Sequence, residues 1–293
     1  MSSTDTGVPA TVAVIGGGTM GAGIVQQFLT SGAHVVLVEA ADAAAEEGRG
    51  RVAAGLERAR VRGRIDTGSQ TLLARLSTVT DTAAIPADTG LVVEAVPERP
   101  DLKIAVLAAA EAAVGEETVL ASNTSSLSVT DLAAALRRPG RFLGIHFFNP
   151  VPASKLVEIV TAPDTDASVV AVVRGWVAAL GKTEIVVRDA PGFATSRLGV
   201  ALGLEAIRMV EEEVASPTDI DTAMELGYRH PMGPLRLTDL VGLDVRLAIA
   251  EHLAEELGDR FAPPDLLRRR VAEGRLGKKT GQGFHTWDEG ESA

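Results

Sequence analysis

His146 and Glu158 are the two residues of this chain whose types and spacing best suit acid–base chemistry. His146 lies in the segment GIHFFNPVPASKLVEIV, and Glu158 follows twelve residues later within the apolar run LVEIV. An imidazole titrates near neutral pH, so it can take a hydroxyl proton while a hydride leaves the adjacent carbon. A carboxylate in an apolar strand needs a partner, and on the other ring nitrogen it would fix the tautomer. We interpret the two as a catalytic pair, the alternative being a histidine that only packs in the core.

The segment VIGGGTMGAGI supplies a second group of residues suited to chemistry, three glycines in the pattern G-x-G-x-x-G after an apolar run. Such glycines allow a tight turn, close approach of a pyrophosphate, and packing of a helix whose N-terminus attracts phosphate. Glu39 ends the next expected strand, where a carboxylate would bind a ribose 2′-hydroxyl and repel a 2′-phosphate. The alternative is a generic turn and a solvated acid. We predict an NAD site formed by Gly16, Gly18, Met20, Gly21 and Glu39.

Short apolar strands alternate with helical patterns through the first two-thirds of the chain. This alternation predicts an α/β fold, a Rossmann-like doubly wound and mostly parallel sheet covered by helices. Beyond Pro191 the periodicity is helical with proline and glycine punctuation, which predicts a second, all-helical domain. We therefore expect an NAD-binding domain over 1–190 and a helical domain over 191–293. The expected strands are 11–16, 34–40, 91–97, 118–123, 141–148, 155–160 and 183–189.

Polar residues follow several of these strands at the point where each strand ends. A doubly wound sheet binds its ligands at the carboxyl ends of its strands, so Glu98, Ser125 and His146 should line one crevice with the nicotinamide. For the serine-rich segment SNTSSLS, the alternative is a polar turn with a helix cap, because Ser128 and Asp131 fit a capping box.

Composition excludes several classes of function. The net charge of −11 argues against nucleic acid or an anionic membrane as the main partner. The absence of cysteine excludes disulfides, a thiolate zinc site and a cysteine nucleophile, and the histidine spacing predicts no metal. The N-terminal segment has no signal-like pattern, and no apolar run reaches a membrane-spanning length, so we expect a cytoplasmic protein.

A set of motifs over roughly residues 10–287 resembles the 3-hydroxyacyl-CoA dehydrogenase family, most closely its bacterial 3-hydroxybutyryl-CoA dehydrogenase branch. The motifs are the glycine loop, SNTSSLS, HFFNPVP, KLVEIV, DAPGF, HPMGPLRLTDLVGLD and GRLGKKTGQGF. The resemblance implies NAD-dependent oxidation of short-chain (S)-3-hydroxyacyl-CoA to 3-oxoacyl-CoA, and the reverse, in fatty acid metabolism. It also implies an acyl-CoA substrate and a homodimer formed through the C-terminal helical domain, which would close over the substrate.

The resemblance assigns roles to individual residues. His146 matches the catalytic histidine, Glu158 the carboxylate that orients it, and Ser125 a serine that contacts the substrate near its reacting oxygen. Ser196 stands where the family commonly has asparagine, so it is expected to make a weakened substrate contact, since a hydroxyl is shorter than an amide. The positions matched to contacts at the nicotinamide end of the cofactor are Glu98, Lys103, Asn149 and Lys279.

The segment EEGRGRVAAGLERARVRGRID is the local concentration of basic residues that could receive the phosphates of an acyl-CoA. The resemblance places there a helical hairpin whose basic residues approach CoA. Its six arginines recur too irregularly for us to expect one shared face, and the alternative for each is a solvated helix with glutamate partners.

Two other functions remain open at this stage. One is a 3-hydroxyadipyl-CoA dehydrogenase of aromatic-acid degradation, which would need a cationic group where the acyl tail ends. The other is a non-catalytic NAD-binding structural protein, which would be expected to lack the pair formed by His146 and Glu158.

Overall fold

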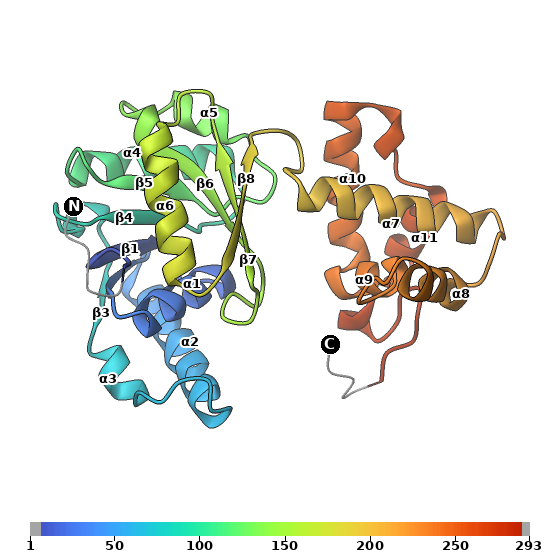
Figure 1. The fold of residues 1–293 in the computed structure, drawn as a ribbon, viewed down its shortest axis with the longest axis horizontal. Coiled ribbons are helices and arrows are strands. Elements are labelled where there is room, and N and C mark those ends of the chain that lie inside the picture. Colours follow the sequence, from blue (N-terminus) through green and yellow to red (C-terminus); the bar gives the residue numbers. More distant parts are fainter. Residues whose placement is uncertain (1–6, 289–293) are drawn as a thin grey trace. The chain divides into compact units, whose positions relative to one another are not determined.

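The computed structural model describes residues 7–288, which form two compact units. The first unit ends at Ala190 and the second begins at Pro191 (Figure 1). Each unit has an apolar core of its own. Within the described residues, no helix is long and apolar enough to span a bilayer.

The first unit is built on a sheet of eight strands. These are β1 (Thr11–Ile15), β2 (His34–Val38), β3 (Leu76–Val79), β4 (Leu91–Glu94), β5 (Val119–Ser122), β6 (Phe142–Phe147), β7 (Leu156–Thr161) and β8 (Thr183–Arg188). Their order across the sheet is β3-β2-β1-β4-β5-β6-β7-β8, and all neighbours are parallel except β6 and β7. The order reverses between β1 and β4, which is where a doubly wound sheet opens a ligand crevice. The predicted fold class is confirmed.

Helices connect the strands and flank the sheet (Figure 1). Those of the first unit are α1 (Thr19–Thr30), α2 (Asp42–Val61), α3 (Ser69–Leu73), α4 (Pro100–Ala113), α5 (Val129–Ala134) and α6 (Ala167–Ala179), with short 3₁₀ turns η1 (Thr82–Ala84) and η2 (Pro139–Arg141). β3, which lies at the edge of the sheet, was not among the strands expected from the sequence. Ser77 and Thr78 of β3 are exposed, so this short strand carries too little apolar pattern to be recognised.

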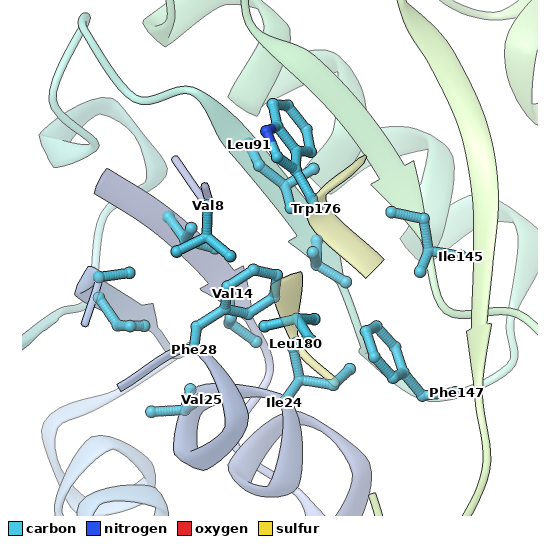
Figure 2. Packing of buried hydrophobic residues seen from close by; sticks show 14 of the residues in the cluster. Val8, Val14, Ile24, Val25, Phe28, Leu91, Ile145, Phe147, Trp176 and Leu180 are labelled. Atoms are coloured by element: carbon cyan, nitrogen blue, oxygen red, sulfur yellow. The ribbon is translucent and has the colours of Figure 1, made fainter. Parts of the chain in front are cut away.

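Packing of apolar side chains between α1, α6 and the sheet forms the core of the first unit (Figure 2). Ile24 and Phe28 of α1 and Trp176 of α6 pack in one cluster with Val14 of β1 and Phe147 of β6. All five side chains are at most 7% exposed. Burying each contributes about 1.5–3 kcal/mol. This packing holds β1 and β6 in place, and therefore fixes the turns at their carboxyl ends.

The second unit consists of helices. They are α7 (Thr195–Glu211), α8 (Pro217–Thr222), the π-helical turn η3 (Ala223–Gly227), α9 (Pro234–Val241), α10 (Leu243–Leu257), η4 (Asp259–Phe261), α11 (Asp265–Ala272) and η5 (Lys278–Thr280). Buried Asp239 of α9 holds the C-terminal segment by accepting hydrogen bonds from the backbone N–H of Phe284 and His285 and from Trp287 Nε1. Pairing within the described part of this unit is limited to isolated bridges, and the prediction of an all-helical region is confirmed.

Candidate active site

The structure brings His146 and Glu158 together across two strands. β6 and β7 are antiparallel, and their register sets His146 directly opposite Glu158. His146 Nδ1 lies 2.7 Å from Glu158 Oε2, and the two residues are 7% and 0% exposed. A carboxylate oxygen accepts, so this contact places the proton on Nδ1 and orients the ring. The Phe148 ring lies 4.4 Å from the imidazole and packs against it. The pair therefore has the geometry of an oriented acid–base group.

Glu98 organises the serine-rich loop that follows β5. Its Oε1 accepts hydrogen bonds from Thr124 Oγ1 at 2.6 Å, from Ser125 N at 2.9 Å and from Ser126 N at 3.1 Å. Ser125 is exposed at the carboxyl edge of the sheet, the edge where β6 also carries His146. The predicted residues Glu98, Ser125 and His146 thus lie on neighbouring segments at one edge, with Glu98 in the role of holding the loop.

Lys103 lies buried beneath this loop rather than at its surface. The side chain is 1% exposed, and its ammonium donates to Glu94 at 2.8 and 3.0 Å and lies 3.1 Å from Glu98 Oε2. Burial by itself would raise the pKa of Glu98, but the charge of Lys103 and hydrogen bonds from Lys103, Thr124 and Ser125 together hold that pKa below its ordinary value of 4.5. Lys103 therefore contributes to the site by holding the carboxylates of Glu94 and Glu98 in place. Glu94, which the sequence analysis did not single out, anchors the network.

Two of the three glycines in the loop are required by close contacts within the fold. Gly16 has φ +98°, and a Cβ there would lie 2.8 Å from the carbonyl oxygen of Ala95. A Cβ on Gly21 would lie 1.7 Å from the oxygen of Gly16, so α1 can pack this closely only without a side chain. A Cβ on Gly18 would meet nothing within 4 Å, which leaves open space over the N-terminus of α1. These are the requirements of a pyrophosphate-binding turn.

A cleft of about 640 Å³ opens beside this loop. It is lined by Gly16, Gly18, Met20 and Glu39 and by Val96 after β4. Its position at the carboxyl ends of β1, β2 and β4 and its size fit the adenosine and pyrophosphate of a dinucleotide. Glu39 also accepts a hydrogen bond from Gly17 N, which fixes its carboxylate at the wall of the cleft.

Replacing Glu39 with glutamine is expected to raise the KM for NADH and to reduce the discrimination against NADPH. Charge-assisted hydrogen bonds contribute about 1.5–3 kcal/mol, so losing those to a ribose should cost about tenfold or more in affinity. Steady-state kinetics with both cofactors would measure this. The exposed Glu46, replaced in the same way, serves as the control. Unchanged cofactor preference in the Glu39 variant would contradict the assignment.

A groove lined by arginines continues along α1 and α2 beside the loop that follows β6. It consists of adjoining depressions of about 310 and 470 Å³ that share Gly55 and Arg58. Arg58, Arg62 and Arg64 line its walls, and their guanidinium groups have no hydrogen-bond or ion-pair partner within the described residues. Arg60 is instead paired with Glu57 at 2.6 Å.

The six arginines do not all share one face, as expected, since Arg49 bonds to Leu76 O and Arg60 to Glu57, but part of the set does lie together. Arg51 and Arg58 line the smaller depression, and Arg58 and Arg62 the larger one. These positions are seven and four residues apart, which places them on one side of a helix. The spacing was visible in the sequence, but the remaining arginines obscured it.

The other predicted site residues lie in three different places. Asn149 lines the arginine groove just before Pro150. Ser196 lies in the first turn of α7, and Lys279 lies in η5 with its ammonium on Asp244. Among residues 7–288, no group of three or more histidine, aspartate or glutamate side chains could hold a metal ion.

A doubly wound dinucleotide-binding sheet, with a histidine–carboxylate pair at its ligand edge, places this protein among the NAD-dependent dehydrogenases. Residues 11–190 match the 3-hydroxyacyl-CoA dehydrogenase NAD binding domain, and residues 192–287 match the C-terminal domain of the same family. The chain therefore belongs to the 3-hydroxyacyl-CoA dehydrogenase family, and its cofactor is NAD.

Individual relatives match over nearly their whole length. A probable 3-hydroxybutyryl-CoA dehydrogenase of Deinococcus radiodurans is 41% identical over 275 residues, covering 94% of this chain and 99% of that protein. The mitochondrial hydroxyacyl-coenzyme A dehydrogenase of Sus scrofa is 41% identical, covering 94% of this chain and 90% of that protein. The crystal structure of (S)-3-hydroxybutyryl-CoA dehydrogenase from Ralstonia eutropha has a TM-score of 0.89 at 40% identity, covering 96% of this chain and all of that one.

Proposed function

We propose that this enzyme interconverts short-chain (S)-3-hydroxyacyl-CoA and 3-oxoacyl-CoA, with 3-hydroxybutyryl-CoA as the simplest substrate. The observation that carries the proposal is the contact of 2.7 Å between His146 Nδ1 and the fully buried Glu158. The names of the Deinococcus and Ralstonia relatives, which refer to 3-hydroxybutyryl-CoA, support the choice of acyl group.

His146 is the general acid–base in this proposal. Since Glu158 holds the proton on Nδ1, the other ring nitrogen, Nε2, takes the hydroxyl proton of the substrate. Glu158 then stabilises the imidazolium, and in the reverse direction Nε2 returns the proton to the carbonyl oxygen. Bound NAD supplies the hydride acceptor at its nicotinamide.

The serines complete the substrate contacts. We assign to Ser125 a hydrogen bond to the reacting oxygen, with Glu98 fixing the loop on which Ser125 lies. Ser196 contributes a second contact from the first turn of α7. For the cofactor, the glycine loop and Glu39 hold the adenosine half. The residues assigned to the nicotinamide half are Glu98, Asn149 and Lys279, with Lys103 acting through Glu98.

The arginine groove is assigned to the phosphates of CoA. Arg58, Arg62 and Arg64 are exposed, lie close together and lack partners in the described chain, so they can meet an anion without breaking an existing ion pair. Arginine binds phosphate with its planar fork of donors. The net charge of −11 makes this local basic surface more selective, because other faces would repel the nucleotide.

The test of the proposed function is NADH oxidation with acetoacetyl-CoA as substrate. The same acetoacetyl group on a short thiol without phosphates should give a kcat/KM at least about tenfold lower, which corresponds to about 1.4 kcal/mol of lost phosphate binding. Free acetoacetate should give still less. Equal turnover of all three compounds, or no turnover of acetoacetyl-CoA, would contradict the proposal.

We also infer that the chain forms a homodimer through its second unit. Exposed large apolar side chains gather there, and contiguous exposed apolar surface commonly marks an interface. Light scattering should then report twice the chain mass of 30.4 kDa, and a monomer would contradict this inference. The side chains concerned are Leu198, Val214, Leu226, Tyr228, Leu237, Val241 and Val245.

A further inference from the structure

Arg246 occupies a position in the second unit where an apolar side chain would be expected. On α10, it belongs to the buried face formed with Leu243, Ala250 and Leu253, at helical spacings of three, four and three residues. Arg246 is only 7% exposed. An arginine on such a face is costly, because desolvating a charge without a partner destabilises the fold.

The other buried cations of the described chain have found partners. Lys103 is held by Glu94 and Glu98, and Lys182 donates to two backbone carbonyls at 2.6 Å each. The side chain of Arg246 has no ion-pair or hydrogen-bond partner within residues 7–288, and its Nε is buried and unsatisfied. Burial lowers the pKa of Arg246 to about 10, so the guanidinium is still charged at neutral pH. A permanent buried charge without a counterion indicates that an anion completes the site.

The guanidinium lies against α7, next to Gly199. A Cβ on Gly199 would lie 3.3 Å from Arg246 Nη1, so the absence of a side chain leaves room for the guanidinium. Gly199 is half-buried and its neighbour Leu198 is exposed, so the guanidinium lies near the surface of α7 rather than at the centre of the unit.

Ser196 lies on the same face of α7 as Gly199, three residues earlier. Residues three apart are neighbours on a helix, and the rise between them is about 4.5 Å. In the proposed function Ser196 contacts the substrate close to its reacting carbon. A chain that passes Ser196 and continues along α7 therefore reaches Arg246 after a few further carbon atoms.

We propose that Arg246 binds a carboxylate at the far end of the acyl group, so that the enzyme accepts 3-hydroxyacyl-CoA thioesters of dicarboxylic acids. The inference rests on the proposed function, and it supplies the cationic group that a 3-hydroxyadipyl-CoA substrate requires. Arginine suits this task, because its donors match the two oxygens of a carboxylate.

The test compares 3-oxoadipyl-CoA with 3-oxohexanoyl-CoA, which has the same six-carbon acyl chain without the carboxylate. The wild type should prefer 3-oxoadipyl-CoA in kcat/KM. Arg246→Met should lower the ratio of the two kcat/KM values by about tenfold or more, the loss expected for a charge-assisted hydrogen bond. Arg246→Lys should retain part of the ratio, since it keeps the charge. Arg208, which lies half-buried on α7 and is paired with Glu205, should leave the ratio unchanged when it is replaced by methionine.

Several outcomes would overturn the inference. A preference of the wild type for 3-oxohexanoyl-CoA would overturn it. This comparison tests the inference even if Arg246→Met fails to fold. Equal losses on both thioesters in Arg246→Met would show a structural role, and a change of oligomeric mass with an unchanged ratio would assign Arg246 to a partner carboxylate. Absence of turnover with acetoacetyl-CoA and both six-carbon thioesters would instead refute the proposed function.

Discussion

Replacing His146 with alanine is expected to lower kcat by about 10²–10⁴-fold, the range that a positioned general acid–base contributes. The loss should fall on kcat, because the imidazole transfers a proton in the transition state and contributes little to cofactor binding. Stopped-flow or steady-state measurement of NADH oxidation with acetoacetyl-CoA would determine it. His285 offers a matched control, since it too is paired with a carboxylate, at 2.8 Å from Asp221, but lies outside the proposed chemistry.

The companion variant Glu158→Gln tests why the histidine works. The amide of glutamine can donate to Nδ1, which would shift the ring proton to Nε2 and leave no acceptor for the substrate hydroxyl. We expect a loss of about 10²-fold or more, at the lower end of the range for acid–base catalysis. If His146→Ala kept the wild-type kcat, another base would have to be found. If only Glu158→Gln kept the wild-type kcat, His146 would act as acid–base without being oriented by the Glu158 carboxylate.

The pair was predictable from the sequence for a definite physical reason. Glu158 interrupts an apolar strand, so its charge required a partner, and a histidine on the neighbouring expected strand was available. Glu94 in LVVEAV also interrupts an apolar strand, so the same reasoning would have predicted a cationic partner for it. The cation is Lys103, nine residues later on a helix, where strand periodicity gives no indication of a contact.

The remaining omissions have a similar origin. Arg246 could have been recognised from sequence, because it stands in line with Leu243, Ala250 and Leu253 at helical spacing. The surroundings of its guanidinium could not, since the group packs next to Gly199, which lies 47 residues away in the chain. Local patterns thus predicted the elements and the functional motifs, whereas the partners of buried charges follow from packing between elements distant in sequence.

Replacing Lys103 with methionine is expected to destabilise the first unit by about 3–5 kcal/mol, the cost of removing one partner from a buried ion pair. Glu94 is 0% exposed and would lose the ammonium that now lies 2.8 Å away. Hydrogen bonds from Val96 N and Ser122 Oγ to Glu94 would remain, but they cannot replace a counterion. Urea unfolding followed by circular dichroism would measure the change.

Two further variants separate a buried charge from a lost contact. Adding Glu94→Gln to Lys103→Met should recover much of the stability, because it removes the uncompensated charge while keeping the shape. Arg60→Met breaks an ion pair of 2.6 Å to Glu57 whose side chains are both 50% exposed, and should change the stability little, because water screens exposed pairs. A Lys103→Met effect as small as that of Arg60→Met would mean that Glu94 is protonated in the fold. In the wild type, Lys103 would then contact Glu94 through hydrogen bonds only, and Glu98 would be its charged partner.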